Sequence, residues 1–337
     1  MIAAVAAFAL VATACGGSSD DTATAATDGT DGLSGTILIS GSSTVEPISA
    51  RVAEDFSKAN PGVGLTVEGP GTGDGFKKFC SGETDISDAS RPIKDREIDA
   101  CKETGIEWIE LYVAIDGLSV LTSPENNKAS CVTFNDLYAL TGPESTGFGK
   151  WSDASDLALE IGGVSATNYF DEDLVITGPG EESGTYDTYV EFVIDGLSEE
   201  RGVDAASRPD YVASPNDNVI IEGIAGSKYS LGWVGYAFYA ENTDKVKALE
   251  VSNGESGCVA PSADTIASGE YPLSRPLFIY VNAKRVVDNS ALASFVDYYL
   301  SEAGLAQVSN AGYVPLADYG PTQDAWINKV IGRNFSS

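Results

Sequence analysis

Three short segments rich in Gly, Ser and Thr have the composition of anion-binding loops. They are Gly41–Pro47 (GSSTVEP), Gly69–Gly75 (GPGTGDG) and Gly178–Thr185 (GPGEESGT), and each precedes a stretch with amphipathic helical spacing. The first N–H groups of a helix have no partner within it, and the helix dipole is positive at that end. Helix starts of this kind can bind a tetrahedral oxyanion. Three in one chain indicate that several loops surround one ligand.

The hydroxyl residues of these segments are the candidate donors. Thr44 can present its hydroxyl and its N–H group, Thr72 stands between two glycines that allow close backbone approach, and Ser183-Gly184-Thr185 repeats the pattern. The alternative for each is a plain N-cap, which stabilises a helix by about 1 kcal/mol and touches no ligand.

Arg91 is the candidate cation. It stands in Asp88-Ala89-Ser90-Arg91-Pro92, at the end of a predicted strand, in a chain with few basic residues. A guanidinium is a forked, permanently charged donor suited to oxyanions. The alternative is a surface salt bridge, which is easily formed in so acidic a protein.

The composition excludes several classes of function. The chain has 20 basic and 50 acidic residues, a net charge of −30 and no histidine. Nucleic acid and anionic membrane surfaces are therefore improbable partners, and a histidine-based catalytic system is excluded. An anion must be bound through local dipoles and a few cations, which screening over roughly 8–10 Å permits.

The elements that position these residues alternate as strand, loop and helix. Strands are predicted over 35–40, 63–68 and 85–89, each ending in a candidate segment, and a second α/β unit begins near Asp116. An apolar strand over 275–281 returns the chain to the first unit. This order favours two α/β lobes with largely parallel sheets, in which ligands lie at the carboxyl ends of strands.

The N-terminus has the pattern of an export signal. Residues 2–12 are apolar and Thr13-Ala14 precede Cys15, which predicts a signal peptide over 1–15 with Cys15 lipidated. The alternative is an ordinary secretory signal with an incidental cysteine. Residues 16–34 are predicted to be a flexible tether.

Four cysteines remain after Cys15: Cys80, Cys101, Cys131 and Cys258. In an exported chain they suggest two disulfides, with three possible pairings. Pairing nearest neighbours, Cys80 with Cys101 and Cys131 with Cys258, keeps each bridge within one candidate domain. Zinc is the alternative, but the spacings contain no CxxC, and we expect no metal or other cofactor.

Segments along almost the whole mature chain resemble the phosphate-binding proteins of Pst-type ABC transporters. They are GSSTVEP (41–47), GPGTGDGF (69–76), DISDASRPI (85–93), GPGEESGTYD (178–187), DNVIIEGIAG (217–226), LGWVGYAFY (231–239), RPLFIYVN (275–282) and NAGYVPL (310–316). The resemblance implies a two-lobed, class II periplasmic-binding-protein fold with the ligand in the interlobe cleft. The predicted bounds are 35–115 with 273–337 for lobe I and 116–272 for lobe II.

The same resemblance implies the phosphate ligands. They are Ser43, Thr44, Val45, Thr72, Ser90 and Arg91 of lobe I, and Glu182, Ser183, Gly184 and Thr185 of lobe II. Some family members have an Asp at the position of Arg91 and an Arg at that of Pro179. Since phosphate carries a proton near neutral pH and sulfate does not, a carboxylate acceptor would select phosphate. We expect Glu182 to be that acceptor, with Asp74 as the alternative.

The function predicted from these features is that of an extracytoplasmic, lipid-anchored, monomeric receptor that delivers phosphate to an ABC permease. It requires no covalent chemistry, and we do not expect an enzyme. The alternatives are a receptor for sulfate, molybdate or arsenate, a secreted phosphatase, or an adhesive or sensory protein.

Overall fold

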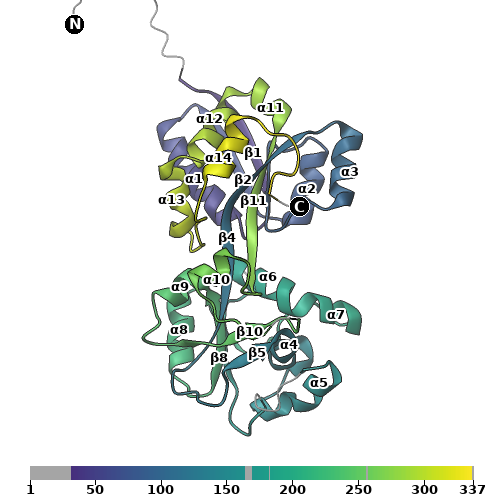
Figure 1. The fold of residues 1–337 in the computed structure, drawn as a ribbon, viewed down its shortest axis with the longest axis vertical. Coiled ribbons are helices and arrows are strands. Elements are labelled where there is room, and N and C mark those ends of the chain that lie inside the picture. Colours follow the sequence, from purple (N-terminus) through teal and green to yellow (C-terminus); the bar gives the residue numbers. More distant parts are fainter. Residues whose placement is uncertain (1–31, 164–168, 182, 256, 336–337) are drawn as a thin grey trace, which may run out of the picture. The chain divides into compact units, whose positions relative to one another are not determined.

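A mixed β-sheet runs through the part of the chain that the structure, a computed structural model, describes (Figure 1). The described residues are 32–163, 169–181, 183–255 and 257–335. The signal peptide, Cys15 and all but the end of the predicted tether therefore lie outside them. Among the described residues the strand order is β2-β1-β3-β11-β4-β8-β6-β7, with β9 on β4.

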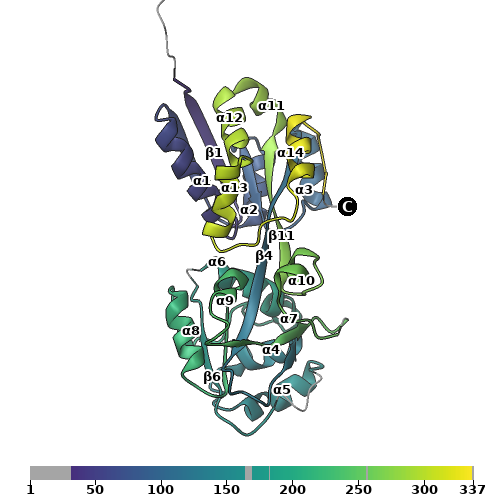
Figure 2. The same cartoon turned by 60° about the vertical axis from the view of Figure 1, so that its left-hand side comes forward.

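Lobe I, as we use the term, contains three parallel strands with helices on both faces. The strands are β1 (Gly35–Gly41), β2 (Val63–Glu68) and β3 (Ile86–Ala89). One face carries α1 (Glu46–Ala59), α12 (Ser290–Tyr299), α13 (Glu302–Asn310) and α14 (Gly320–Ile327); the other carries α2 (Thr72–Cys80) and α3 (Asp95–Thr104) (Figure 2). Helix α11 (Ala283–Asp288) follows β11.

Lobe II is built around a second parallel set. Its strands are β6 (Val175–Gly178), β7 (Val212–Ala213) and β8 (Ser230–Gly235), joined by β9 (Lys247–Ala248) on β4, while β5 (Cys131–Thr133) and β10 (Glu250–Ser252) form a separate parallel pair. Its helices are α4 (Phe134–Thr141), α5 (Ser155–Glu160), α6 (Gly184–Tyr189), α7 (Asp195–Arg201), α8 (Asp217–Ala225), α9 (Tyr236–Ala240) and α10 (Ala263–Ala267). Short helical turns cover Pro143–Ser145, Trp151–Ala154 and Val190–Ile194.

Two long strands connect the lobes. β4 (Trp108–Thr122) and β11 (Ser274–Asn282) pair in antiparallel register and run between the two groups of elements in Figure 1. The sequence placed the start of the second α/β unit near Asp116, but β4 does not end there. It continues because Leu118, Val120 and Leu121 are buried and this end of β4 pairs with β8 and β9.

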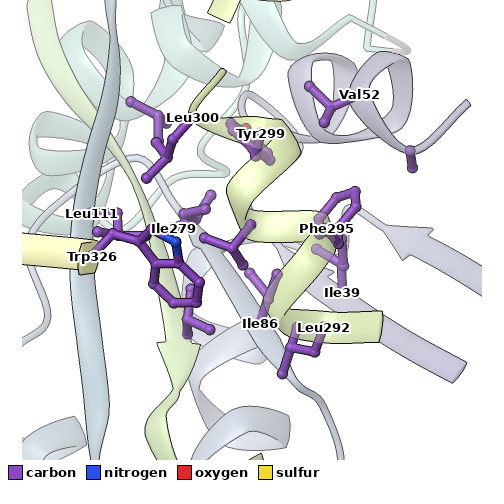
Figure 3. Close-up of a cluster of buried hydrophobic side chains, with 14 of the residues drawn as sticks. Ile39, Val52, Ile86, Leu111, Ile279, Leu292, Phe295, Tyr299, Leu300 and Trp326 are labelled. Carbon is purple, nitrogen blue, oxygen red and sulfur yellow. The ribbon is translucent and has the colours of Figure 1, made fainter. Parts of the chain in front are cut away.

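Each lobe has its own apolar core. In lobe I, Phe295 and Tyr299 of α12 meet Ile39, Ile86 and other strand side chains, and α1 and α14 close the cluster (Figure 3). In lobe II the main core contains Trp151, Tyr189 and Trp233, and the last two stack with ring centroids 4.1 Å apart. The predicted α/β architecture, mostly parallel within each lobe and flanked by helices, is confirmed.

Both disulfides pair nearest neighbours in sequence, as predicted. Cys80–Cys101 joins α2 to the facing side of α3, with Cα atoms 4.3 Å apart. Cys131–Cys258 anchors β5, with Cα atoms 6.0 Å apart. Among the described residues, no helix is both long enough and apolar enough to cross a membrane.

Candidate functional site

The carboxyl ends of β1, β2 and β3 bring the first-lobe segments together. The Gly71 N–H donates to the Gly41 carbonyl at 2.8 Å, and the Ser42 N–H donates to the Asp88 carbonyl at 2.9 Å. Gly75 permits this approach, because a Cβ there would lie 2.4 Å from the Gly41 Cα. The loops after three adjacent parallel strands thus form one surface, as the sequence predicted.

Thr72 and Ser90 form the side of this surface that joins the second and third loops. Their hydroxyls lie 3.0 Å apart, and the Ser90 N–H donates to the Thr72 hydroxyl at 3.2 Å. Gly71 precedes Thr72 with φ +105°, a conformation that suits glycine, and turns the chain into α2. Two predicted ligands are therefore direct neighbours.

The first loop presents Ser43 and Thr44 toward lobe II. The Ser43 hydroxyl donates to the Asp187 carboxylate at 2.8 Å, and the Thr44 hydroxyl lies 3.4 Å from that of Thr188. Val45 differs from the expectation of an open N–H donor. Its N–H donates to the Ser42 carbonyl at 3.2 Å and its side chain is fully buried in the lobe I core.

The second-lobe segment faces this loop. A Cβ on Gly184 would lie 3.2 Å from the Ser43 carbonyl oxygen and 3.6 Å from the Thr44 Cα. Ser183 caps α6 by accepting the Thr185 N–H at 3.2 Å. Glu182, the predicted proton acceptor, lies outside the described residues. Asp74, the alternative, forms an exposed ion pair with Lys77 at 2.7 Å, which lowers its pKa.

Arg91 lies at the end of β3 but is paired with a carboxylate. Its two terminal nitrogens donate to both oxygens of Glu97, at 2.9 and 2.7 Å, and the guanidinium lies 5.6 Å from the Phe76 ring centroid. Burial alone would raise the pKa of Glu97, but Arg91 and the Lys94 N–H lower it below its usual value. A salt bridge is therefore present, as in the alternative that the sequence offered, but it is largely shielded from solvent and not a surface pair.

A second arginine, Arg275, was not among the predicted site residues. It lies on β11 directly opposite Asp116 of β4, and its Nη2 donates to the Thr44 hydroxyl at 2.8 Å. The sequence signal for it is an arginine at the head of an otherwise apolar strand (RPLFIYV), where a buried charge needs partners.

A cavity of about 250 Å³ opens beside the second-lobe segment. Its lining includes Thr185, which is one of the predicted phosphate-binding residues, and the carboxylates of Asp116, Asp217 and Glu241. Tyr313 lines it from lobe I. Burial raises the pKa of Asp116, against the opposing effect of Arg275, and burial also raises the pKa of Asp217. In the described residues no group of three or more Cys, Asp or Glu side chains is arranged to hold a metal ion.

Known proteins resemble this chain over most of its length. Residues 23–303 match the model of the PBP superfamily domain. The chain is 39% identical to the protein SphX of Synechocystis sp., over 84% of this chain and 79% of that protein. It is 32% identical to the phosphate-binding protein PstS of Staphylococcus saprophyticus, over 87% of this chain and 85% of that protein.

A solved structure shares the fold as well as the sequence. It is that of a possible phosphate binding protein from Planctomyces limnophilus, 39% identical, with a TM-score of 0.78 over 88% of this chain and 99% of that one. A phosphate transport receptor from Vibrio cholerae, 20% identical with a TM-score of 0.59, shares the fold alone. With its converging loops, two lobes and these relatives, the chain belongs to the PBP superfamily, in the family of SphX and PstS.

Proposed function

We propose that this chain captures inorganic phosphate between its two lobes and delivers it to an ABC permease. The observation that carries the proposal is that Gly184 faces Ser43 and Thr44, so that hydroxyl and N–H donors from both lobes meet. The names of its relatives in the PstS family support phosphate as the anion. Thr44 is only 2% exposed, so the ligand enters when the lobes separate.

The proposed donors are those that the sequence singled out. They are Ser43, Thr44, Thr72, Ser90, Arg91, Ser183, Gly184 and Thr185; Val45 is left out because its N–H already donates to the Ser42 carbonyl. The convergence of the three lobe I loops supports the donors from lobe I. The approach of Gly184 to Ser43 and Thr44 supports the donors from lobe II. Charge-assisted hydrogen bonds of this kind contribute about 1.5–3 kcal/mol each.

We also propose the lobe bounds 35–115 with 273–337, and 116–272. The main lobe I core draws its buried members from 37–114 and 277–326, whereas the lobe II core draws on 115–273 and Val314. The division of buried side chains at Ile115 and Leu273 supports hinges at these positions.

Glu182 remains our proposed acceptor of the phosphate proton. Glu182→Gln should reduce the preference for phosphate over sulfate, because sulfate offers no proton to a carboxylate. Asp74→Asn is the matched control, since Asp74 already pairs with Lys77 at 2.7 Å. Isothermal titration with both anions measures the preference. Unchanged selectivity in Glu182→Gln removes its role, and a loss in Asp74→Asn transfers the role to Asp74.

We further propose an extracytoplasmic monomer that is lipid-anchored at Cys15 and has no enzymatic activity. The lack of histidine supports binding over catalysis, because Ser or Thr nucleophiles need a base. Calorimetry should detect binding of phosphate. The protein should not hydrolyse a chromogenic phosphate ester. Tighter binding of sulfate, molybdate or arsenate, or turnover of the ester, would contradict the proposal.

A further inference from the structure

Arg275 is surrounded by polar groups from both lobes. Its side chain is 7% exposed, and Nε donates to Asp116 at 3.3 Å while Nη1 contacts Glu191. Nη2 donates to the hydroxyls of Thr44 and Thr188. Thr44 belongs to the first loop of lobe I and Thr188 to α6 of lobe II, so one nitrogen bridges the two sides of the proposed phosphate site.

The charge around Arg275 argues against a role as the cation that attracts the anion. Asp116 is 8% exposed at its side chain and Glu191 is 52% exposed, and both carboxylates contact the one guanidinium. The cluster therefore carries no net positive charge when both carboxylates are ionised. Arg275 therefore contributes through the fixed positions in which its planar guanidinium holds its hydrogen-bond partners.

The hydrogen bond from Arg275 orients the Thr44 hydroxyl. A hydroxyl has one proton to donate and lone pairs to accept. Because Thr44 accepts from Arg275 at 2.8 Å, its lone pair is engaged and its proton points elsewhere. The neighbouring Thr188 hydroxyl is 3.4 Å away, longer than a good O–H···O bond, so it does not hold that proton strongly.

Arg275 also orients the hydroxyl of Thr188, on the lobe II side of the proposed site. It accepts from Arg275 and donates to the Gly184 carbonyl at 2.8 Å or to Asp116 at 3.1 Å. Its proton is thereby directed into lobe II, and the carbonyl of Gly184 is held in the first turn of α6. Arg275 thus connects the orientation of Thr44 to the segment that faces it.

We propose that Arg275 is a positioning residue for anion capture, which holds Thr44 as a hydrogen-bond donor and links it through Thr188 to Gly184. The inference rests on the proposed function and adds a residue to it. Arg275 touches the ligand's donors and not the ligand. A purely structural alternative is a hinge ion pair between β11 and β4, which Arg275 and Asp116 form in any case.

Arg275→Lys separates these roles. A lysine keeps the charge beside Asp116, but one ammonium cannot reproduce the fork that holds Asp116, Thr44 and Thr188 together. The dissociation constant for inorganic phosphate should rise about tenfold in Arg275→Lys, and by a similar factor in Thr44→Val. In the double variant the second change should add less than about twofold, because both changes act through the same donor, the Thr44 hydroxyl.

The experiment is calorimetry of phosphate binding with the wild type, both single variants and the double variant. Arg285→Lys is the matched control, because Arg285 pairs with the buried Asp85 at 2.8 Å and contacts neither threonine. It should lower the unfolding temperature without changing phosphate affinity. Unfolding temperatures of every variant show which of them fold.

The outcomes separate the two proposals. A wild type that does not bind phosphate overturns the proposed function itself. A wild type that binds, with unchanged affinity in Arg275→Lys or with fully additive losses in the double variant, overturns the role of Arg275. If Arg275→Lys does not fold, Thr188→Val tests the same link, and unchanged phosphate affinity there also overturns it.

Discussion

Arg91 and Glu97 form a bidentate ion pair at the end of β3, beside two predicted ligands. Their side chains are 18% and 10% exposed, so the pair is shielded from solvent. A carboxylate on the guanidinium opposes anion binding by neutralising it, and it also orients the arginine. The effect of Glu97 on affinity therefore reveals what Arg91 contributes.

We predict that Arg91→Ala raises the phosphate dissociation constant about tenfold or more. Glu97→Gln should leave affinity unchanged or strengthen it, because it removes a negative charge from the guanidinium. Calorimetry of both variants measures this. An unchanged dissociation constant in Arg91→Ala would make Arg91 a structural partner of Glu97 only.

Asp88 lies on β3 just before these residues and is fully buried. Neither carboxylate oxygen has a hydrogen-bond partner of normal geometry among the described residues. Burial raises its pKa from 3.8 to about 7, with the Ser49 hydroxyl acting in the opposite direction. A folded-state pKa above the unfolded value means that stability is lost as pH rises between these values.

We predict that Asp88→Asn stabilises the protein more at pH 8 than at pH 4.5. The wild type loses roughly 1.4 kcal/mol per pH unit only where the pH lies between the two pKa values, or roughly 3 kcal/mol between pH 4.5 and pH 8, and the asparagine variant does not. Urea unfolding at both pH values gives the free energies of unfolding. If the free energies of unfolding of Asp88→Asn and the wild type differ by the same amount at both pH values, the pKa of Asp88 is not raised.

At the scale of elements, the disulfides tie helices and strands that the sheet alone does not hold. Cys80–Cys101 joins neighbouring helices over a sequence separation of 21, and Cys131–Cys258 closes a separation of 127. In the chain-entropy model the longer loop restricts the unfolded state more.

We predict that replacing Cys131 and Cys258 by serine destabilises the protein more than replacing Cys80 and Cys101. The chain-entropy model gives about 5 and about 3 kcal/mol for the two pairs. Chemical unfolding of the two double variants provides the comparison, and phosphate affinity reports whether the site is intact. The reverse order of stabilities would show that native packing, not loop closure, dominates.

At the scale of the whole molecule, the net charge of −30 opposes the approach of an anion. The proposed site works against this field through short-range donors at strand ends. Salt screens the long-range repulsion and leaves hydrogen bonds in the closed site largely unaffected.

We predict that the rate of phosphate association rises a few-fold when sodium chloride is raised from about 0.05 to 0.5 M. Stopped-flow tryptophan fluorescence measures the rate. A matched titration with sodium perchlorate separates screening from competition by chloride. A rate that falls with both salts would mean that a local positive field guides the anion in.

Much of the site followed from local sequence. Residues such as Thr44, Thr72 and Ser90 stand where a strand ends and a helix begins, and parallel strands bring such ends to one edge of a sheet. Arg275 did not follow from local sequence, because its partners Thr44 and Thr188 are 231 and 87 residues away in the chain.

The sequence by itself determined the loops, the alternation of strands and helices, the exclusion of histidine chemistry and the family resemblance, because these depend on residue types and short spacings. Tertiary structure decided which charges neutralise each other. It paired Arg91 with Glu97, set Arg275 against Asp116 through the register of β4 and β11, and isolated Asp88 in the core. Arg91 and Glu97 are only 6 residues apart in the chain, so for that pair the fold decides how far it is shielded from solvent. The surroundings of Arg275 and Asp88 depend on long-range packing and burial, because the free energy of a charge is set by neighbours that only the fold brings near it.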